Sequence, residues 1–387
     1  MRDAQRIADD WTSQALRGRK VLLTGHTGFK GGWLALWLRR LGADICAVAL
    51  PPSDGAPSYF NAVRVEELLD HRIADIGASD ALGAALAGVD AEVIFHLAAQ
   101  SLVRPAYADP VGTFRTNVVG TAAILEAARH MPSLRAIVVV TSDKCYDNRE
   151  WSWGYRENDT LGGADPYSAS KGCAELVAEA FRRSFFAGPD APLLATVRAG
   201  NVFGGGDWAV DRLVPDIVRA AAARTPMTIR NPAAIRPWQH VLEPLAGYLQ
   251  VATALLDGDR MAASAWNFGP DAGDAIDVGS FARALVERWG SGAPDIRYDD
   301  HAAAVPEAGV LRLDSTKARV SLGWRPKLSL ETAIDMTVDW YKAHQRGTAD
   351  MRALSQRQID SYLSHPASPD LTQHIHIVQA SESAACA

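Results

Sequence analysis

Short apolar runs alternate with helical patterns along the first half of this 387-residue chain. Each run is bounded by turn residues, and the runs read VLLTG, ICAVAL, VIFHLAA, AIVVVTS and LLATVRAGNV. Runs of about four to six apolar residues are typical of strands buried on both faces of a sheet. Because helical stretches of about ten or more residues separate them, the pattern predicts an α/β fold with a Rossmann-type, doubly wound parallel sheet.

The pattern changes after about residue 200, where GGGDW, RNPAAIRPWQH and NFGPDAGD form loops rich in Gly, Pro, Trp and Arg. We therefore predict a sheet domain over residues 1–200 and a smaller C-terminal substrate-binding region over residues 201–236 and 263–362. Helical patterns cover 241–256 and 280–289, and segment 237–262 is expected to pack back on the sheet domain. Residues 363–387 are polar with small side chains and are expected to form a flexible tail.

Composition argues against several classes of partner. The net charge of -6 offers no basic stripe for a phosphate backbone, so nucleic acid is not expected to bind. No apolar run reaches the roughly 18 residues of a membrane span, and the first twenty residues lack the apolar middle of a secretory signal. We expect a cytoplasmic protein. The scattered cysteines (Cys46, Cys145, Cys173 and Cys386) have no C-x-x-C spacing, so we expect reduced thiols and no metal site.

A glycine loop, GHTGFKG, lies directly between the first predicted strand and an amphipathic helix. Gly25 permits a tight turn, Gly28 permits close approach of a pyrophosphate to the backbone, and Gly31 permits close packing of the helix. The N-terminus of that helix then faces the anion. In this context the loop predicts dinucleotide binding.

The spacing G-x-x-G-x-x-G resembles that of the extended short-chain dehydrogenase/reductase superfamily. NAD is the expected cofactor, although NADP stays open because AVALPPSDG offers only Ser53 and Asp54 for the adenosine ribose. The sequence favours His96 as a core histidine. The expected cofactor contacts are Gly25, Thr27, Gly28, Phe29, Lys30, Asp75, Ile76, Leu97, Ala98, Ala99, Gln100, Thr141, Tyr167 and Lys171.

The segment DPYSASKGCAELVAEAF places Tyr167 and Lys171 one turn apart on one helix face. A nearby cation favours the phenolate of a Tyr, which then accepts a proton from an alcohol while hydride leaves its carbon. Ser142, at the tip of a central predicted strand, supplies a hydroxyl to share that proton. Asp143 and Lys144 follow it at the same tip, and an additional acid there suggests a step beyond hydride transfer.

The longest motifs resemble the CDP-glucose 4,6-dehydratases, a family of extended short-chain dehydrogenases/reductases. They are GHTGFKGGWLALWL, HLAAQSLVRPAY, TSDKCYDNREWSWGYREND, DPYSASKGCAELVA, RAGNVFGGGDWAVDRLVPD, RNPAAIRPWQHVLEPLAGY and WNFGP. The resemblance implies conversion of CDP-glucose to a 4-keto-6-deoxy sugar nucleotide by a homodimer, in deoxysugar biosynthesis such as that of O-antigens.

By this resemblance Tyr167 removes the proton of the carbon 4 hydroxyl as hydride passes to NAD. Asp143 then protonates the leaving carbon 6 hydroxyl, and hydride returns to carbon 6. Lys144 either takes the carbon 5 proton or, if charged, stabilises the enolate while Tyr167 or Glu157 takes that proton. Substrate contacts are expected from Asn201, Trp208, Arg212, Arg230, Arg236, Trp238 and Glu307.

Two other classes of function are open alternatives. Another nucleotide-sugar 4,6-dehydratase or a 4-epimerase would use the same Tyr167 and Lys171. A cofactor-sensing binding protein without turnover would keep the glycine loop and lose Tyr167 or Lys171, and both are present.

Overall fold

The computed structural model describes residues 12, 14–52, 55–271, 275–299 and 309–366. Its main sheet has seven parallel strands in the order β11-β6-β5-β4-β1-β2-β3, which confirms the predicted Rossmann-type fold. The strands are β1 (Lys20–Thr24), β2 (Asp44–Ala49), β3 (Asp70–Ile73), β4 (Val93–His96), β5 (Ala136–Val140), β6 (Leu193–Ala199) and β11 (Ala265–Phe268).

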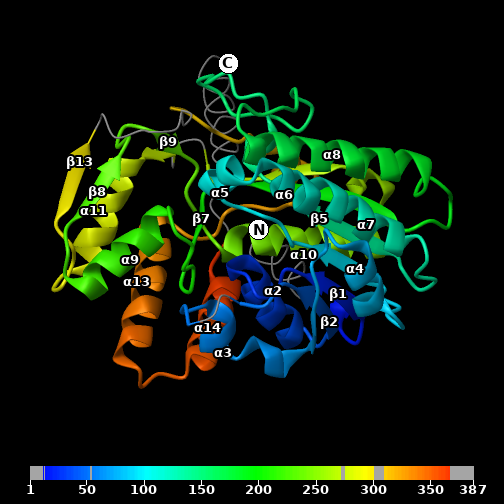
Figure 1. Ribbon diagram of the computed structural model, residues 1–387, viewed down its shortest axis with the longest axis horizontal. Helices are drawn as coiled ribbons and strands as arrows, with labels where there is room; N and C mark the ends of the chain where they lie inside the picture. Colours follow the sequence, from blue (N-terminus) through cyan, green and yellow to red (C-terminus); the bar gives the residue numbers. More distant parts are fainter. Residues whose placement is uncertain (1–11, 13, 53–54, 272–274, 300–308, 367–387) are drawn as a thin grey trace, which may run out of the picture.

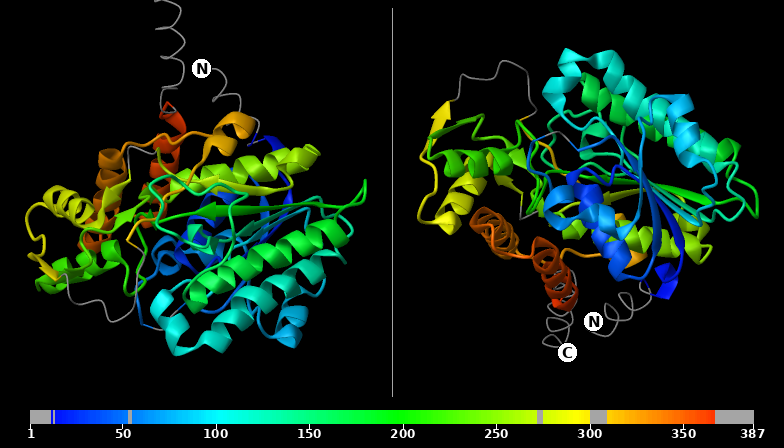
Figure 2. Two further views of the ribbon diagram at one scale, coloured as in Figure 1. Left: turned by 90° about the horizontal axis from the view of Figure 1, so that it is seen from above. Right: turned by 60° about the horizontal axis from the view of Figure 1, so that its bottom comes forward.

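Helices cover both faces of this sheet (Figures 1 and 2). Side chains alternate between the faces of a strand, so Val21 and Leu23 belong to one core cluster and Leu22 to another. The first cluster includes α2 (Phe29–Arg40) and α10 (Leu242–Leu256), and the second includes α4 (Ser79–Leu86), α7 (Gly120–Ala128) and α8 (Pro166–Ser184). This double cover explains why β5 and β6 are buried along their whole length.

Three two-stranded sheets form the C-terminal region beside the main sheet: β7 (Val202–Phe203) with β10 (Gln239–His240), β9 (Ile235–Arg236) with β12 (Ile276–Asp277), and β8 (Met227–Arg230) with β13 (Ile296–Asp299). Helices α9 (Leu213–Ala223), α11 (Val278–Trp289) and α13 (Leu330–Arg346) lie with them at the left of Figure 1. The remaining helices are α3 (Tyr59–Val63), α5 (Val103–Ala108), α6 (Pro110–Phe114), α12 (Thr316–Leu322) and α14 (Met351–Ser364). Short 3-10 segments cover Val65–Leu68, Asp143–Cys145 (η3) and Arg260–Ala262, and a π-helical turn covers Arg115–Val119.

The expected division into domains stays a prediction. Helix α10 packs against β5 and β6. Strand β11 pairs in parallel with β6, so residues 265–268 extend the main sheet from within the predicted substrate-binding region. Helix α14 runs to Ser364, and residues 367–387 of the predicted tail lie outside the described part. In that described part, no helix is both long and apolar enough to span a bilayer.

Candidate active site

A cavity of about 670 Å3 opens at the carboxyl ends of the central strands. The strand order reverses direction between β1 and β4, and ligands of open parallel sheets bind in the crevice at such a switch point. All the predicted catalytic and cofactor-binding residues line this cavity, together with Asn201, Arg212, Arg230, Arg236 and Trp238. The fold therefore collects side chains that lie far apart in the sequence.

One predicted substrate contact within the described residues, Trp208, does not line the cavity. The ring of Trp208 is not part of the lining and packs against Tyr341 and His344, with ring centroids 5.2 and 5.3 Å apart. Because α13 supplies both of these partners, the indole is taken up by packing between the loop and that helix. Glu307 lies outside the described residues.

The glycine loop leaves room only for backbone. Gly25 has φ +82°, and a Cβ there would lie 2.7 Å from the nitrogen of Ala98. A Cβ at Gly31 would lie 2.1 Å from the oxygen of Gly25, so helix and strand make the close approach that the spacing predicted. No side chain caps the N-terminus of α2 at Gly28, and the cavity meets it there. Uncapped N–H groups at such a terminus bind an anion, so the loop fits a dinucleotide pyrophosphate.

Helix α8 brings the predicted Tyr and Lys to the cavity. Pro166 occupies its first turn and the Asp165 side chain caps it by accepting from the Ser168 nitrogen, 3.0 Å away. The Nζ of Lys171 donates to the Val140 carbonyl oxygen at 3.3 Å, beside the tip of β5. Burial lowers the pKa of Lys171 to about 8.

The surroundings of Tyr167 do not by themselves favour its phenolate form. Burial raises its pKa to about 12, and a hydrogen bond with Ser142 and the positive charge of Arg212 offset this only in part. The charge of Asp143 raises the same pKa further, and both side chains line the cavity. In the protein alone Tyr167 is therefore a neutral phenol, and it needs further positive charge to act as a base.

The tip of β5 forms a compact polar turn. The Ser142 hydroxyl accepts from the Lys144 nitrogen at 3.2 Å and donates to Asp143 Oδ1 at 2.9 Å. Asp143 Oδ2 is buried without a hydrogen-bond partner among the described residues, and a Cβ at Gly200 would lie 2.6 Å from it. Burial raises the pKa of Asp143 against the charges of Lys144, Arg236 and Lys30. A buried carboxyl with one unused oxygen is suited to carry and deliver a proton.

Lys30 lines the cavity and has charged neighbours there that the sequence did not indicate. Its ammonium interacts electrostatically with Arg212, Asp143, Lys171 and Asp207, and burial with the neighbouring cations lowers its pKa to about 7. Its predicted contact with the cofactor stays a prediction. The structure adds that the catalytic side chains are its neighbours.

Two arginines of the C-terminal region, Arg212 and Arg230, pair with acids that were not predicted from the sequence. Arg212 donates to Asp207 Oδ2 at 2.9 Å and to Ser101 Oγ at 3.2 Å. Asp211 pairs with Arg104 at 2.8 Å and with Arg230 at 3.4 Å. Both acids lie in the GGGDWAVDR motif, whose Asp residues were the available signal.

The hydrogen bonds of His96 and Glu157 indicate the role of each side chain. His96 is buried and hydrogen-bonded through both ring nitrogens, to Thr24 at 2.7 Å and Thr121 at 3.0 Å, which confirms it as a core histidine. Glu157 does not line the cavity, and its Oε1 accepts from the Asn267 nitrogen at 2.9 Å. Glu157 is thus poorly placed to take a proton from a substrate, which leaves Lys144 and Tyr167.

Known proteins share this sequence and this architecture. The family model described as GDP-mannose 4,6 dehydratase matches residues 22–337. The chain belongs to this dehydratase family. Within it, the chain is 48% identical over 352 residues to the CDP-glucose 4,6-dehydratase of Salmonella typhimurium, which covers 90% of the chain and 97% of the relative. The sequence resemblance is thereby confirmed.

Other dehydratases are more distant from this family member. A dTDP-glucose 4,6-dehydratase of Streptomyces griseus is 31% identical over 84% of the chain and 94% of the relative. The crystal structure of the dTDP-glucose 4,6-dehydratase DesIV from Streptomyces venezuelae, determined with NAD bound, superposes with a TM-score of 0.70. It covers 85% of this chain and 98% of that chain at 24% identity, and it supports the fold.

Proposed function

We propose that the chain is a CDP-glucose 4,6-dehydratase, a hydro-lyase that converts CDP-D-glucose to CDP-4-dehydro-6-deoxy-D-glucose and water. The observation that carries dehydration is the Asp143 carboxyl, which lines the same cavity as Tyr167 and has one buried oxygen without a hydrogen-bond partner among the described residues. A simple alcohol dehydrogenase or a 4-epimerase has no use for this second acid. The choice of the CDP sugar rests on the 48% identity to the Salmonella enzyme.

NAD is the cofactor in this proposal. The closely packed glycine loop and the uncapped N-terminus of α2 fit its pyrophosphate, and Asp75 and Ile76 line the same cavity beyond the end of β3. When bound in this cavity, NAD would supply the chemistry of hydride removal from carbon 4 of the sugar and of hydride return to carbon 6. The protein residues then have three tasks: to bind the sugar nucleotide, to exclude water and to move protons.

Proton movement is assigned to three side chains. Tyr167 takes the proton of the carbon 4 hydroxyl, with the Ser142 hydroxyl hydrogen-bonded beside it. The ketone that forms acidifies the hydrogen on carbon 5, and Lys144 is positioned at the cavity wall to take it or to stabilise the enolate. Asp143 gives its proton to the carbon 6 hydroxyl, which leaves as water.

Arg212, Arg230 and Arg236 are proposed to bind the diphosphate of the substrate, because guanidinium groups match phosphate oxygens with paired hydrogen bonds. Asn201 and Trp238 line the same cavity. The homodimer and the cytoplasmic location expected from the sequence stay predictions.

The substrate test uses the purified protein with NAD and a panel of CDP-, dTDP-, UDP- and GDP-hexoses. Products are followed by the ultraviolet absorbance that 4-keto-6-deoxy sugars develop in base, with Tyr167→Phe as the matched inactive control. We expect turnover of CDP-glucose above all others. Turnover of another sugar nucleotide with none of CDP-glucose would reject the substrate, and a 4-epimer in place of the keto sugar would reject the dehydration.

A further inference from the structure

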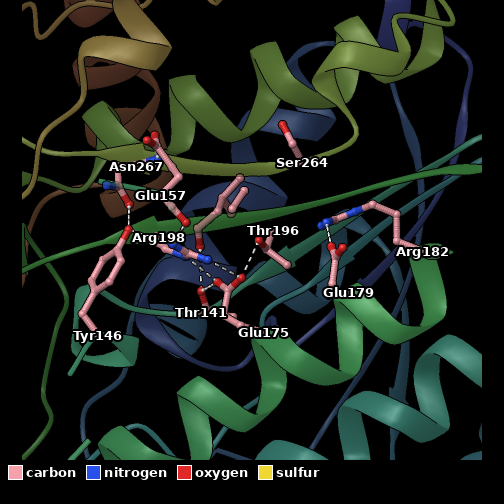
Figure 3. Close-up of polar contacts among 12 residues, drawn as sticks. Thr141, Tyr146, Glu157, Glu175, Glu179, Arg182, Thr196, Arg198, Ser264 and Asn267 are labelled. Carbon is pink, nitrogen blue, oxygen red and sulfur yellow. Dashed lines mark hydrogen bonds and ion pairs between the residues drawn. The ribbon is translucent and has the colours of Figure 1, made fainter. Parts of the chain in front are cut away.

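A buried ion pair joins the catalytic helix α8 to strand β6. Glu175 follows Lys171 by one turn on α8 and does not line the cavity. Its Oε2 lies 2.8 Å from Nη2 of Arg198 on β6, and both side chains are only 3% exposed (Figure 3). Burying two charges is costly unless further hydrogen bonds satisfy them.

Those further hydrogen bonds join three elements of the site. Glu175 Oε1 accepts from the Thr141 hydroxyl and from Arg198 Nε, the latter at 2.8 Å. Glu175 Oε2 accepts from the Thr196 hydroxyl at 2.7 Å in addition to the Arg198 bond. Four donors on two oxygens are the environment of an ionised carboxylate. Burial opposes the charge, but these partners hold the pKa of Glu175 below its ordinary value.

The far side of the pair is also anchored. Arg198 Nη1 donates to the Tyr146 hydroxyl at 2.7 Å and to the Glu157 carbonyl oxygen at 3.0 Å. The Tyr146 hydroxyl donates in turn to Asn267 Oδ1 on β11, 2.7 Å away (Figure 3). Tyr146 directly follows η3, which carries Asp143 and Lys144. Both ends of the catalytic turn are therefore connected to one ion pair.

We propose that Glu175 is a positioning residue, whose buried carboxylate holds Lys171 as a cation and fixes the Thr141 end of β5 against α8. Lys171 and Thr141 lie on adjacent elements: the ammonium donates to Val140, and the next residue along the chain donates to Glu175. This assignment rests on the proposed function, because it takes Lys171 as part of the reaction centre.

Glu175, one turn further along α8, is the acid whose charge acts on Lys171. Burial lowers the pKa of Lys171, and Glu175 is the largest influence that raises it. Tyr167 lies one turn earlier on the same helix, and Cys145 on η3, His96 at the end of β4 and Lys30 on α2 interact electrostatically with Lys171. Burial keeps His96 neutral and the pKa values of Tyr167 and Cys145 high, while Lys30 repels the ammonium.

This arrangement predicts the direction in which the pKa of Lys171 changes when Glu175 loses its charge. An ammonium titrates at lower pH when its neighbouring anion is removed, so loss of the Glu175 charge lowers the pKa of Lys171. The fraction of cationic Lys171 then falls at and above neutral pH. We expect a shift of about one pH unit, the lower end of what an adjacent opposite charge produces.

The experiment compares wild type, Glu175→Gln and Glu175→Asp with Glu179→Gln as matched control. Glu179 lies one turn further along α8 and pairs with Arg182, but it is 45% exposed (Figure 3). The pKa of Lys171 is read without turnover, from the pH dependence of its acetylation by acetic anhydride and mass spectrometry of the Lys171 peptide. The pH profile of kcat/KM is measured in parallel.

We expect Glu175→Gln to lower the titration midpoint of Lys171 and to move the basic limb of kcat/KM to lower pH. Glu175→Asp keeps the charge and should restore the midpoint, and Glu179→Gln should match wild type. A wild-type midpoint in folded Glu175→Gln overturns the proposal. If the unpaired Arg198 charge prevents folding, Glu175→Gln combined with Arg198→Gln removes both charges. The midpoint of Lys171 should then be lowered by less than in the single variant, because loss of the Arg198 cation offsets part of the effect, and a midpoint at or above that of wild type overturns the proposal. Failure of CDP-glucose turnover with a shifted midpoint would count against the proposed function alone.

Discussion

Replacement of Asp143 by Asn tests the acid step more directly than any other change. Asn keeps the size of the side chain and the oxygen that accepts from Ser142 at 2.9 Å. It replaces the other oxygen, Oδ2, which is buried without a partner among the described residues. The substitution thus removes a transferable proton while the turn around it keeps its hydrogen bond. We expect the stability of the fold to change by no more than about 1 kcal/mol.

The expected loss is confined to elimination. A general acid contributes a factor of about 100 to 10,000 to a rate, which corresponds to about 3 to 5 kcal/mol of barrier. Oxidation at carbon 4 depends on Tyr167 and Lys171, so it should continue in Asp143→Asn. Reduced cofactor and a 4-keto-glucose intermediate should then accumulate on the enzyme.

The assay follows the reduced cofactor by stopped-flow absorbance after CDP-glucose is mixed with the NAD-loaded variant. Keto product released into base is measured on the same samples, and the wild-type enzyme serves as control. Elimination at a wild-type rate in Asp143→Asn would remove Asp143 from the acid role. A folded variant that binds both ligands but forms no reduced cofactor would show that Asp143 acts in oxidation instead.

Three further substitutions separate the other roles. Tyr167→Phe should keep cofactor and sugar binding but lose turnover by about 100-fold or more, because only proton transfer is removed; near-normal turnover displaces Tyr167. Lys144→Ala should oxidise carbon 4 and accumulate reduced cofactor without deuterium entry at carbon 5. Rescue of elimination by small primary amines, at rates that follow the pKa of the amine, would identify Lys144 as the base. Elimination at the wild-type rate would exclude Lys144 from the mechanism. Arg236→Ala should mainly raise KM for CDP-glucose, since Arg236 is assigned to the diphosphate; an unchanged affinity rejects that assignment.

Features that depend on local spacing could be predicted from the sequence. The runs AIVVV and LLATVRA predicted strands buried on both faces, and β5 and β6 are buried throughout. The glycine spacing predicted the close approach that Gly25 and Gly31 make. A four-residue separation on a helix places Tyr167 and Lys171 on one face whatever surrounds them. Such patterns are readable because each is set within one element or one turn.

Contacts between side chains of different elements depend on how those elements pack in three dimensions. The sequence could not indicate that Asp207 pairs with Arg212, that Lys30 has catalytic neighbours, or that Trp208 packs on α13. Strand β11 joins the main sheet from the C-terminal half, because its backbone pairs with the free edge of β6.

The same holds for Glu175 and Arg198. A Glu on a helix and an Arg in an apolar strand each conflict with their own surroundings, since an isolated buried charge is costly. The conflict disappears only when α8 packs on the sheet and brings Glu175 within 2.8 Å of Arg198. Spacing along the chain fixes the direction in which a side chain points, whereas its partner is fixed by the packing of elements that are remote in sequence.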